Sequence, residues 1–510
     1  MTDPAWARHL PEGVTPGSVD LTRRVSLPAA WVARWRSHPD EPVIGEPDGS
    51  WIRAGELLER TRLAAGRMAL AGLRPGDRVL VSGSASGDLV VAHVAALRAG
   101  LVVVPVNRAY SRREIEVIVH DARPRAAILD RPELRSWVAE IDPTVVMTDV
   151  DLSGLPERPA AAPDPASDIA SDAGLDAVGV DDPALLPYTS GTTGRPKGAL
   201  LSHGNLLASA EALVLAWRWT PSDRLILCLP LFHMHGLGVG LHGSLLAGGS
   251  VLLQPAFDPE SVLAAAGEAT LFFGVPTMYA RIVDAPDPGR LRALRLCVSG
   301  SAPLSAELHE RVRRSCGQEV LERYGMTETV MLVSNPYDGE RRAGTVGIAL
   351  PGVDLRLDPT TSEIEVRGPN VFHGYFERPD ADATSFTDDG WFRTGDVGAI
   401  DEEDYVSIVG RAKELIISGG FNVYPREVED VVRTHPSVID VAVVGTPSDE
   451  WGETVTAYVE ATDDLDVATL TGWVAEHLVP YKRPRIVHRV DALPRNAMGK
   501  VVRSELRPPA

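Results

Sequence analysis

Residues 188–203 read YTSGTTGRPKGALLSH, and six of the nine positions from Thr189 to Lys197 are Ser, Thr or Gly. A loop of this kind, following the apolar ALLPY, presents backbone N–H groups and hydroxyls to phosphate oxygens, and Lys197 adds a positive charge. It is not a Walker A loop, because Pro196 stands where that motif needs glycine before the lysine. The stretch therefore predicts a phosphate site of another type, with a flexible surface turn as the alternative.

Composition sets the limits for the rest of the chain. The 510 residues include 44% hydrophobic and 24% charged residues, which is typical of a globular protein with two or three domains. The formal charge of −20 opposes binding to nucleic acid or anionic lipid, so a polyanionic ligand must be met by a local basic pocket. We therefore expect no nucleic-acid partner.

The cysteines and the most apolar segments indicate the cellular compartment in which the protein is expected to work. Cys228, Cys297 and Cys316 form no CxxC pair and are too few for a disulfide framework, which favours a reducing cytoplasm. The first residues lack the order of a signal peptide, and His93 and Arg98 interrupt the most apolar early run. We therefore expect a cytoplasmic protein without a membrane span.

The rhythm along the chain predicts an α/β fold. From about residue 51 to 130, Val-rich segments alternate with amphipathic helical patterns, as in βα units, with a helix ending at Gly100 and a buried strand over Leu101–Val106. Residues 156–183 are rich in Ala, Asp and Pro and predict a mobile linker. The βα rhythm resumes over 185–320, short antiparallel strands follow over 344–409, and a helix-strand-strand pattern after Arg411 predicts a small α+β domain.

Five segments together resemble the adenylate-forming enzymes, the superfamily of acyl-CoA synthetases, peptide-synthetase adenylation domains and firefly-type luciferases. Besides the opening stretch they are RYGMTET from Arg323, GWFRTGD from Gly390, GRAKELIISGGFNVYPREVE from Gly410 and PRNAMGKVVRSEL from Pro494. The resemblance covers the chain from about Trp51 onward. It implies an N-terminal adenylation domain over 1–412 with parallel or mixed α/β layers and an antiparallel β subdomain, and a mobile α+β domain over 413–510.

The side chains in these motifs suit a nucleotide. Tyr324 offers a flat face for adenine, Glu328 is the carboxylate candidate for Mg²⁺, and Asp396 is suited to accept the ribose hydroxyls. Packing, a solvated acid and a helix cap are the respective alternatives. The resemblance implies that ATP is bound by Thr189, Ser190, Gly191, Thr192, Thr193, Gly194, Lys197, Arg323, Tyr324, Gly325, Met326, Thr327, Asp396 and Arg411, and that Mg²⁺ is bound by Glu328 and Thr192.

The implied reaction has two steps. The substrate carboxylate attacks the α-phosphate of ATP, pyrophosphate leaves, and a thiol then displaces AMP from the acyl-adenylate. The residues expected to act in catalysis are Lys500, Thr192, Glu328 and His233. Lys500 is also the position at which a regulatory lysine acylation would act.

The C-terminal motifs point to CoA as the thiol. By resemblance the C-terminal domain pivots at Lys413 between the two steps, and Gly419 and Gly420 let the pantetheine arm pass, with an ordinary turn as the alternative. Lys482 and Arg483 lie in the basic segment VPYKRPRIVHRV, which suits the CoA phosphates, although a solvated face explains such residues equally well.

The substrate acid is predicted from resemblance to a narrower group of enzymes. LPLFHMHGL, FGVPTMYARI, CVSGSAPL and GERRAGTVG are similar to malonyl-CoA and methylmalonyl-CoA synthetases. This implies that His233, Arg281, Ser301 and Met326 bind the acid, with Arg281 pairing the second carboxylate and His233 gating the first. GGFNVYPREVE is instead typical of broader acyl and aryl-CoA ligases. A fatty-acid or aryl-acid ligase therefore stays an alternative, followed by a luciferase-like oxygenase and a noncatalytic acyl or nucleotide-binding protein.

Overall fold

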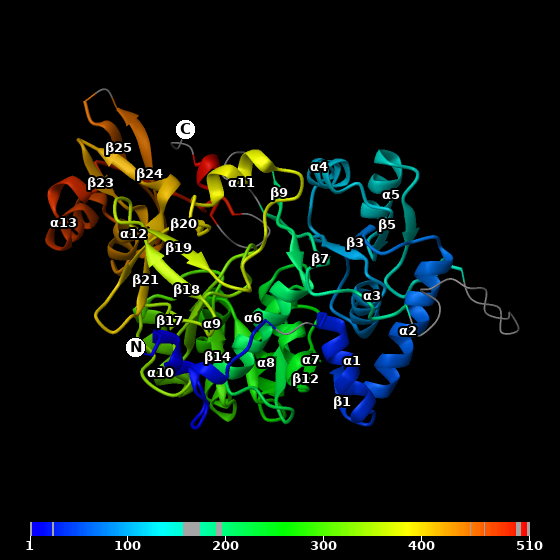
Figure 1. Cartoon of the computed structure of the whole chain (residues 1–510). Coiled ribbons are helices and arrows are strands. Elements are labelled where there is room, and N and C mark those ends of the chain that lie inside the picture. Colours follow the sequence, from blue (N-terminus) through cyan, green and yellow to red (C-terminus); the bar gives the residue numbers. More distant parts are fainter. Residues whose placement is uncertain are drawn as a thin grey trace, which may run out of the picture. The chain divides into compact units, whose positions relative to one another are not determined.

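A computed structural model of the chain describes residues 3–22, 25–156, 174–189, 196–448, 450–463, 465–495 and 501–506 (Figure 1). Most of the predicted linker, the phosphate-loop residues 190–195 and the segment 496–500 with Lys500 lie outside these ranges. The chain divides into two compact units, Met1–Asp354 with Val366–Phe392, and Leu355–Glu365 with Arg393–Ala510. The predicted boundary at residues 412 and 413 stays a prediction.

The larger unit contains a nine-stranded sheet in the order β17-β16-β15-β14-β13-β11-β12-β1-β2. The strands from β1 to β15 along this order are parallel, and β2, β16 and β17 add antiparallel edges. The strands are β1 Pro42–Gly45, β2 Trp51–Arg53, β11 Arg224–Leu227, β12 Ser250–Leu253, β13 Leu271–Gly274, β14 Leu296–Ser299, β15 Leu321–Tyr324, β16 Val333–Ser334 and β17 Ile348–Ala349.

A six-stranded sheet in the order β10-β7-β4-β3-β5-β6 lies in the same unit. Its central strand β4 is buried at every residue, because its Val side chains pack on helices on both faces, as a parallel sheet requires. The helix α3 ends at Arg98, and Gly100 follows with φ of +73°, as predicted for its end. The strands are β3 Arg78–Ser82, β4 Val102–Pro105, β5 Ala126–Leu129, β6 Val146–Thr148, β7 Pro183–Leu185 and β10 Leu201–Ser202.

Two further sheets follow in the chain. A four-stranded sheet has the order β18-β19-β20-β21, and a second sheet has the order β23-β22-β25-β24 with β26 parallel to β25. The mixed α/β layers, the antiparallel strands and the α+β end confirm the predicted fold class. The strands are β18 Asp354–Leu357, β19 Glu363–Arg367, β20 Phe392–Ile400, β21 Val406–Arg411, β22 Ile416–Ser418, β23 Phe421–Val423, β24 Val438–Ser448, β25 Gly452–Ala461 and β26 Ile486–Val490.

The helices cover the sheets (Figure 1), with α7 beside β12, α5 beside β5, and α3 beside β3 and β4. Several begin with a Ser or Asp cap, such as Ser111 with Glu114 at the start of α4. They are α1 Leu27–Ser37, α2 Ala54–Leu70, α3 Gly87–Arg98, α4 Arg112–Ala122, α5 Pro132–Ile141, α6 His203–Ala216, α7 His242–Ala247, α8 Pro259–Ala265, α9 Pro276–Val283, α10 Ala306–Cys316, α11 Pro379–Ser385, α12 Pro425–Arg433 and α13 Val467–His477.

The core beneath α9 and α10 holds all the cysteines. Cys228, Cys297 and Cys316 are free and buried together with Tyr279 and Phe272 in one hydrophobic cluster. Burial raises the pKa of the Cys228 thiol to about 12 and that of Cys316 to about 11. These thiols therefore act as small apolar side chains at neutral pH.

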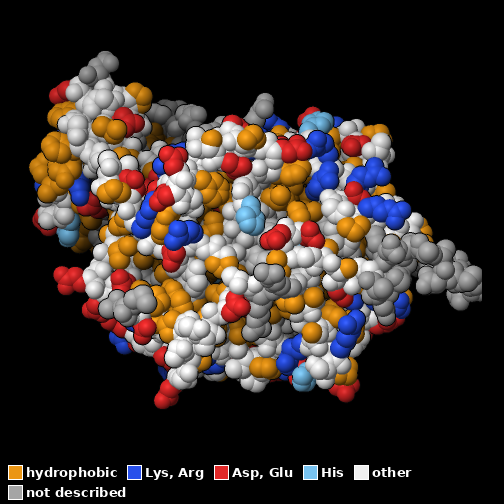
Figure 2. Space-filling model, in the orientation of Figure 1, with side chains coloured by type: hydrophobic (Ala, Val, Ile, Leu, Met, Phe, Trp, Pro, Cys, Tyr) orange, Lys and Arg blue, Asp and Glu red, His pale blue; other side chains and the backbone are white. Residues whose placement is uncertain are grey.

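The surface carries mixed charge. Figure 2 shows basic and acidic side chains interspersed with apolar ones over the face in view. No helix in the described part of the chain is long and apolar enough to cross a membrane.

Candidate active site

A short hairpin holds the predicted phosphate loop. β8 Tyr188–Thr189 pairs antiparallel with β9 Lys197–Gly198, so that Thr189 stands opposite Lys197. The Thr189 hydroxyl donates to the Lys197 carbonyl oxygen over 3.4 Å. The hairpin brings together the two ends of the loop. Its central members Ser190, Gly191, Thr192, Thr193 and Gly194 lie outside the described residues, so their assignment stays a prediction.

A second segment runs beside this hairpin. Tyr375 forms a β-bridge with Ala199, and the Phe376 N–H donates to the Gly198 carbonyl oxygen over 2.9 Å. The Leu200 N–H donates to the Gly374 carbonyl oxygen over 3.3 Å. The backbone around Tyr375 is thereby fixed against the strand that ends the phosphate loop.

The motif RYGMTET forms a tight turn between β15 and β16. A Cβ at Gly325 would lie 2.3 Å from the Val330 carbonyl oxygen, so only glycine fits there. Val330 itself has φ of +58°, which is strained for a β-branched residue. The turn buries Glu328 and leaves Tyr324, Met326 and Thr327 half-buried.

Glu328, Tyr375 and Lys197 meet in one place. The Tyr375 hydroxyl donates to Glu328 Oε1 over 2.8 Å, and the Lys197 Nζ lies 4.9 Å from the centre of the Tyr375 ring. Burial, and then the Glu328 carboxylate, raise the pKa of Tyr375, so the phenol stays a donor. The site therefore presents one oriented carboxylate and one cation over an aromatic face.

The single carboxylate of Glu328 fits a metal ion that is held mainly by the phosphates of a bound substrate. Among the residues that the structure describes, no three His, Cys, Asp or Glu side chains gather as a metal site. Mg²⁺ is often bound by one or two carboxylates together with substrate phosphates and water. A single buried carboxylate beside a phosphate loop agrees with that pattern.

A cluster of polar side chains lies at the carboxyl ends of β14 and β15. Ser301 has φ of +67°, and its hydroxyl lies 3.2 Å from Nδ1 of the buried His235. The Arg323 side chain packs directly on Gly300. A Cβ added at Gly300 would lie 2.4 Å from the guanidinium carbon. In parallel sheets this edge is the usual place for ligands.

The Arg323 guanidinium is the most conspicuous group of this cluster. Its side chain is buried, and its Nε and Nη2 have no hydrogen-bond partner within the described part of the chain. Burial lowers the pKa of Arg323 to about 9, with Glu322 acting in the opposite direction, so the group stays charged at neutral pH. Burial also lowers the pKa of His235 well below its usual value, which leaves that ring neutral. The cluster thus contains a desolvated cation without a hydrogen-bonding anion at these two nitrogens.

His235 begins a π-helix, His235–Leu241, that is buried throughout. The close packing allows no side chain at Gly236, where a Cβ would lie 2.4 Å from the Pro230 carbonyl oxygen. A wide helix of this kind is rare and is often found at functional sites. The predicted gate His233 precedes it, is half-buried, and accepts a weak hydrogen bond on Nδ1 from the His235 N–H over 3.4 Å.

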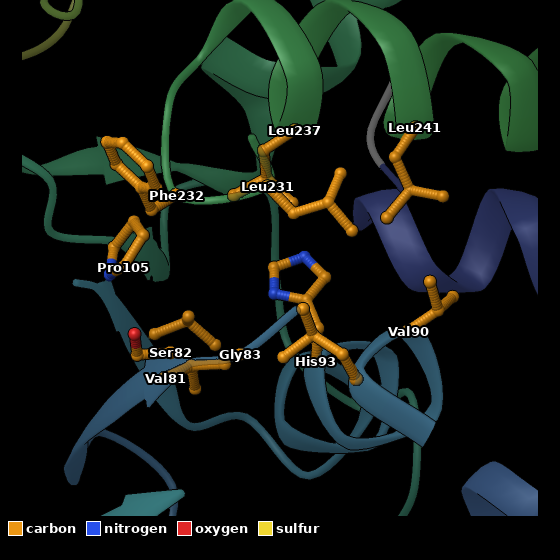
Figure 3. A pocket seen from close by; sticks show the side chains of 12 residues that line it. Val81, Ser82, Gly83, Val90, His93, Pro105, Leu231, Phe232, Leu237 and Leu241 are labelled. Carbon is orange, nitrogen blue, oxygen red and sulfur yellow. The ribbon is translucent and has the colours of Figure 1, made fainter. Parts of the chain in front are cut away.

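An apolar hollow lies on another side of the π-helix (Figure 3). Its empty space is about 350 Å³ including space open to solvent, and Figure 3 shows the His93 ring in the middle of its lining. His93 Nε2 lies 2.8 Å from Nε2 of His242. The hollow is lined by Val81, Ser82, Gly83, Leu89, Val90, His93, Val103, Pro105, Leu231, Phe232, Leu237 and Leu241.

Arg281, predicted to pair a second carboxylate, lies in the last turn of α9. Its side chain is exposed, and its guanidinium carbon lies 4.9 Å from the centre of the Phe257 ring. This packing is compatible with a structural cation–π contact. Its substrate role stays a prediction.

Asp396 and Arg411 stand opposite each other on β20 and β21. Arg411 Nε lies 2.8 Å from Asp396 Oδ1, and Asp396 is buried while Arg411 is exposed. The pair therefore offers a carboxylate and a guanidinium side by side, as the predicted ribose contacts require.

The residues predicted for CoA lie in the smaller unit. Gly419 and Gly420 have φ of +59° and +80° and form the two-residue turn between β22 and β23, so the turn alone demands glycine-like conformations. Lys482 Nζ pairs with Glu427 at 2.5 Å, and Arg483 donates to the Leu478 carbonyl oxygen over 2.7 Å. The predicted hinge Lys413 is exposed in a short 3-10 helix, Ala412–Glu414.

His235 and Tyr375 were not predicted as site residues. The sequence holds a signal for His235, because FHMHG contains two histidines, and His235 is the buried one. The sequence holds no signal for Tyr375, because a single tyrosine in HGYFERPD belongs to no recognisable spacing and meets Glu328 only in the folded chain.

Comparison with known proteins gives a consistent result. A sequence model of the AMP-binding enzymes matches residues 31–376, and one of the AMP-binding enzyme C-terminal domain matches residues 427–500. A feruloyl-CoA synthase of an Amycolatopsis species is 36% identical, covering 93% of this chain and 97% of that protein. The mitochondrial malonate–CoA ligase of Mus musculus is 34% identical, covering 88% and 85%. The crystal structure of ATP-bound MatB from Rhodopseudomonas palustris is 40% identical with a TM-score of 0.85, covering 93% and 97%.

Proposed function

The chain belongs to the family of AMP-binding enzymes, and on this premise we propose that it joins a short dicarboxylic acid, such as malonate or methylmalonate, to CoA. It is an ATP-dependent, AMP-forming acid–CoA ligase that uses Mg²⁺. Its relatives include a feruloyl-CoA synthase as well as a malonate–CoA ligase. The choice of acid is therefore the open part of the function.

One observation supports the dicarboxylate, namely the buried Arg323 guanidinium whose Nε and Nη2 find no partner among the described residues. A desolvated cation with unmet donors is costly unless an anion binds there. The second carboxylate of a short diacid meets this need, whereas an aryl or alkyl tail would leave the donors unmet. Ser301 and His235, which contact each other, add polar groups to the same cluster.

The remaining groups are assigned to the first step. Tyr324 supports the adenine, Asp396 and Arg411 bind the ribose, and Lys197 with the loop hydroxyls binds phosphate oxygens. Mg²⁺, when bound, neutralises phosphate charge, and Glu328 is the residue that would hold it. Lys500 and Thr192 are assigned to the charge that develops at the α-phosphate, and His233 to orienting the attacking carboxylate.

The second step needs a thiol at the acyl carbon of the acyl-adenylate. Lys482 and Arg483 are assigned to the CoA phosphates, and the turn at Gly419 and Gly420 to the pantetheine arm. Attack by the thiol forms the thioester and releases AMP.

The test is an ATP-dependent and CoA-dependent AMP-release assay with malonate, methylmalonate, butyrate and ferulate. We expect kcat/KM for the two diacids to exceed that for butyrate by at least about thirtyfold, because pairing a buried charge is worth about 2–5 kcal/mol. A preference for ferulate or butyrate would overturn the dicarboxylate assignment and leave the ligase class in place.

Two arginine variants sharpen the test. Arg323→Met should raise KM for malonate far more than KM for butyrate, because only malonate loses a charge pair. Arg281→Ala is the variant for comparison, because the Arg281 guanidinium is exposed and packs on the Phe257 ring. A malonate-selective defect in Arg281→Ala with none in Arg323→Met would return the role to Arg281.

A further inference from the structure

Tyr375 occupies a position between the two groups assigned to the triphosphate. Its hydroxyl donates to Glu328 Oε1 over 2.8 Å, and its ring lies 4.9 Å from Lys197 Nζ. These three residues come from three separate segments of the larger unit. One side chain thus contacts both the carboxylate assigned to the metal and the cation assigned to the phosphates.

The backbone around Tyr375 is held from both sides. Towards the phosphate loop it pairs with Ala199 and Gly198, as described above. Towards the turn with Glu328, the Phe372 N–H donates to the Glu328 carbonyl oxygen over 2.9 Å. Asn370 Nδ2 donates to the carbonyl oxygens of Thr329 and Met331 over 2.9 and 2.7 Å. Residues 370–376 therefore connect the end of the loop to the turn with Glu328.

Tyr375 is also held by contacts of its own backbone and ring. Its backbone N–H donates to Asp382 Oδ1 over 2.8 Å, and its ring packs edge-on against Phe372 at a centroid distance of 4.8 Å. A phenol held in this way directs its hydroxyl at one carboxylate oxygen and so limits rotation of the carboxylate. Side chains that orient a metal-ligating group commonly change metal affinity by tenfold or more.

We propose that Tyr375 is a positioning residue that orients the Glu328 carboxylate toward the Mg²⁺ of bound MgATP while keeping Lys197 beside the phosphates. The inference rests on the proposed function, because it takes the ligand of Glu328 to be the metal of a nucleotide. Tyr375 itself contacts neither the metal nor the reacting atoms. Its effect is carried by the carboxylate that it holds.

The test uses the full-length protein and Mn²⁺ as a spectroscopic substitute for Mg²⁺. Binding of Mn²⁺ in the presence of α,β-methylene-ATP is followed by electron paramagnetic resonance. We expect Tyr375→Phe to weaken Mn²⁺ binding by about tenfold, the size expected for loss of one hydrogen bond to a charged group. Binding of AMP in excess EDTA and the thermal midpoint should stay as in the wild type.

Tyr337→Phe serves as the matched control, because it removes a phenol hydroxyl that interacts with Arg295 instead. It should leave Mn²⁺ binding unchanged. A second pair, Glu328→Gln and Glu328→Gln with Tyr375→Phe, tests the route of the effect. If Tyr375 acts through Glu328, the double variant should bind Mn²⁺ as weakly as Glu328→Gln alone.

The outcomes separate the two proposals. Normal Mn²⁺ binding by Tyr375→Phe would overturn the positioning role, as would an equal loss of AMP binding in EDTA, which indicates general disturbance of the site. A wild-type protein that binds no Mn²⁺ with the nucleotide analogue would instead overturn the metal assignment of the proposed function.

Discussion

At the scale of single residues, buried neutral histidines stand out. His203 begins α6 fully buried, and neither ring nitrogen has a partner within the described residues. Burial lowers its pKa to about 4 and that of His93 to about 3. Both side chains are therefore neutral in the folded protein at any pH near neutrality.

The lowered pKa values of these histidines predict that the folded protein loses stability in acid. Between the unfolded pKa of about 6.5 and the folded pKa the unfolded chain binds the extra proton, so stability falls as pH falls. Each such histidine contributes a slope of up to about 1.4 kcal/mol per pH unit in that window and none above it. His203→Leu should therefore lose less thermal stability between pH 7 and pH 5 than the wild type.

Differential scanning calorimetry at the two pH values measures this change. The exposed His120→Gln, whose side chain is 66% accessible, is the control and should behave as the wild type. An unaltered drop in midpoint for His203→Leu would mean that His203 titrates normally in the folded state.

At the scale of secondary-structure elements, two tight turns carry the motifs. Gly325 lies within the turn that places Glu328, and Gly420 lies at the tip of the β22–β23 hairpin. The surroundings differ, because a Cβ at Gly325 collides with backbone while one at Gly420 meets no atom within 4 Å. Only the second position therefore accepts a side chain at the cost of backbone strain alone.

Gly420→Leu should block thioester formation while acid-dependent pyrophosphate release survives for at least one turnover. A bulky side chain there would obstruct the pantetheine arm, and the first step does not need that arm. Single-turnover assays of each half-reaction measure the difference.

The control is Gly420→Ala, which shares the left-handed strain of about 1 kcal/mol but adds only a methyl group. It should retain both half-reactions. If Gly420→Leu loses both, or if Ala and Leu behave alike, the turn is structural and the pantetheine route lies elsewhere.

Much at this scale was predictable from sequence, and the exceptions have physical reasons. Mostly apolar segments gave β3, β4 and β5, because a strand buried on both faces must carry mainly apolar side chains. The π-helix was not foreseen, because an apolar Gly-Leu segment carries no signal for i→i+5 bonding. The resemblance assigns Arg323 to the nucleotide, and that assignment stays a prediction. The burial of Arg323 and its unmet donors were not foreseen, because they depend on packing at the end of the neighbouring strand β14.

At the scale of the whole molecule, the chain forms two compact units, and Asp396 and Arg411 fall within the smaller one. The resemblance implies that the chain pivots at Lys413 between the half-reactions and that Lys500 acts only in the first. Lys413 is exposed in the 3-10 helix Ala412–Glu414 between β21 and β22.

Lys500→Ala is the test of this alternation. Adenylation, followed as pyrophosphate release, should slow by at least about a hundredfold, by analogy with loss of one donor to a developing charge. Thioester formation from presynthesised acyl-adenylate and CoA should stay near normal. Comparable loss in both assays would mean that Lys500 is structural or that one conformation performs both steps.

The sequestered cysteines have a practical outcome for such measurements. Free CoA exposes a thiol that reacts with Ellman's reagent, whereas Cys228, Cys297 and Cys316 are shielded and held as thiols by their surroundings. Colour developed in samples withdrawn from a reaction and mixed with the reagent therefore counts the remaining CoA alone, and its decrease from sample to sample follows turnover. Once the fold is lost, the same three sulfurs become titratable, so a single chromogenic reagent reports catalysis in native buffer and denaturation in guanidinium.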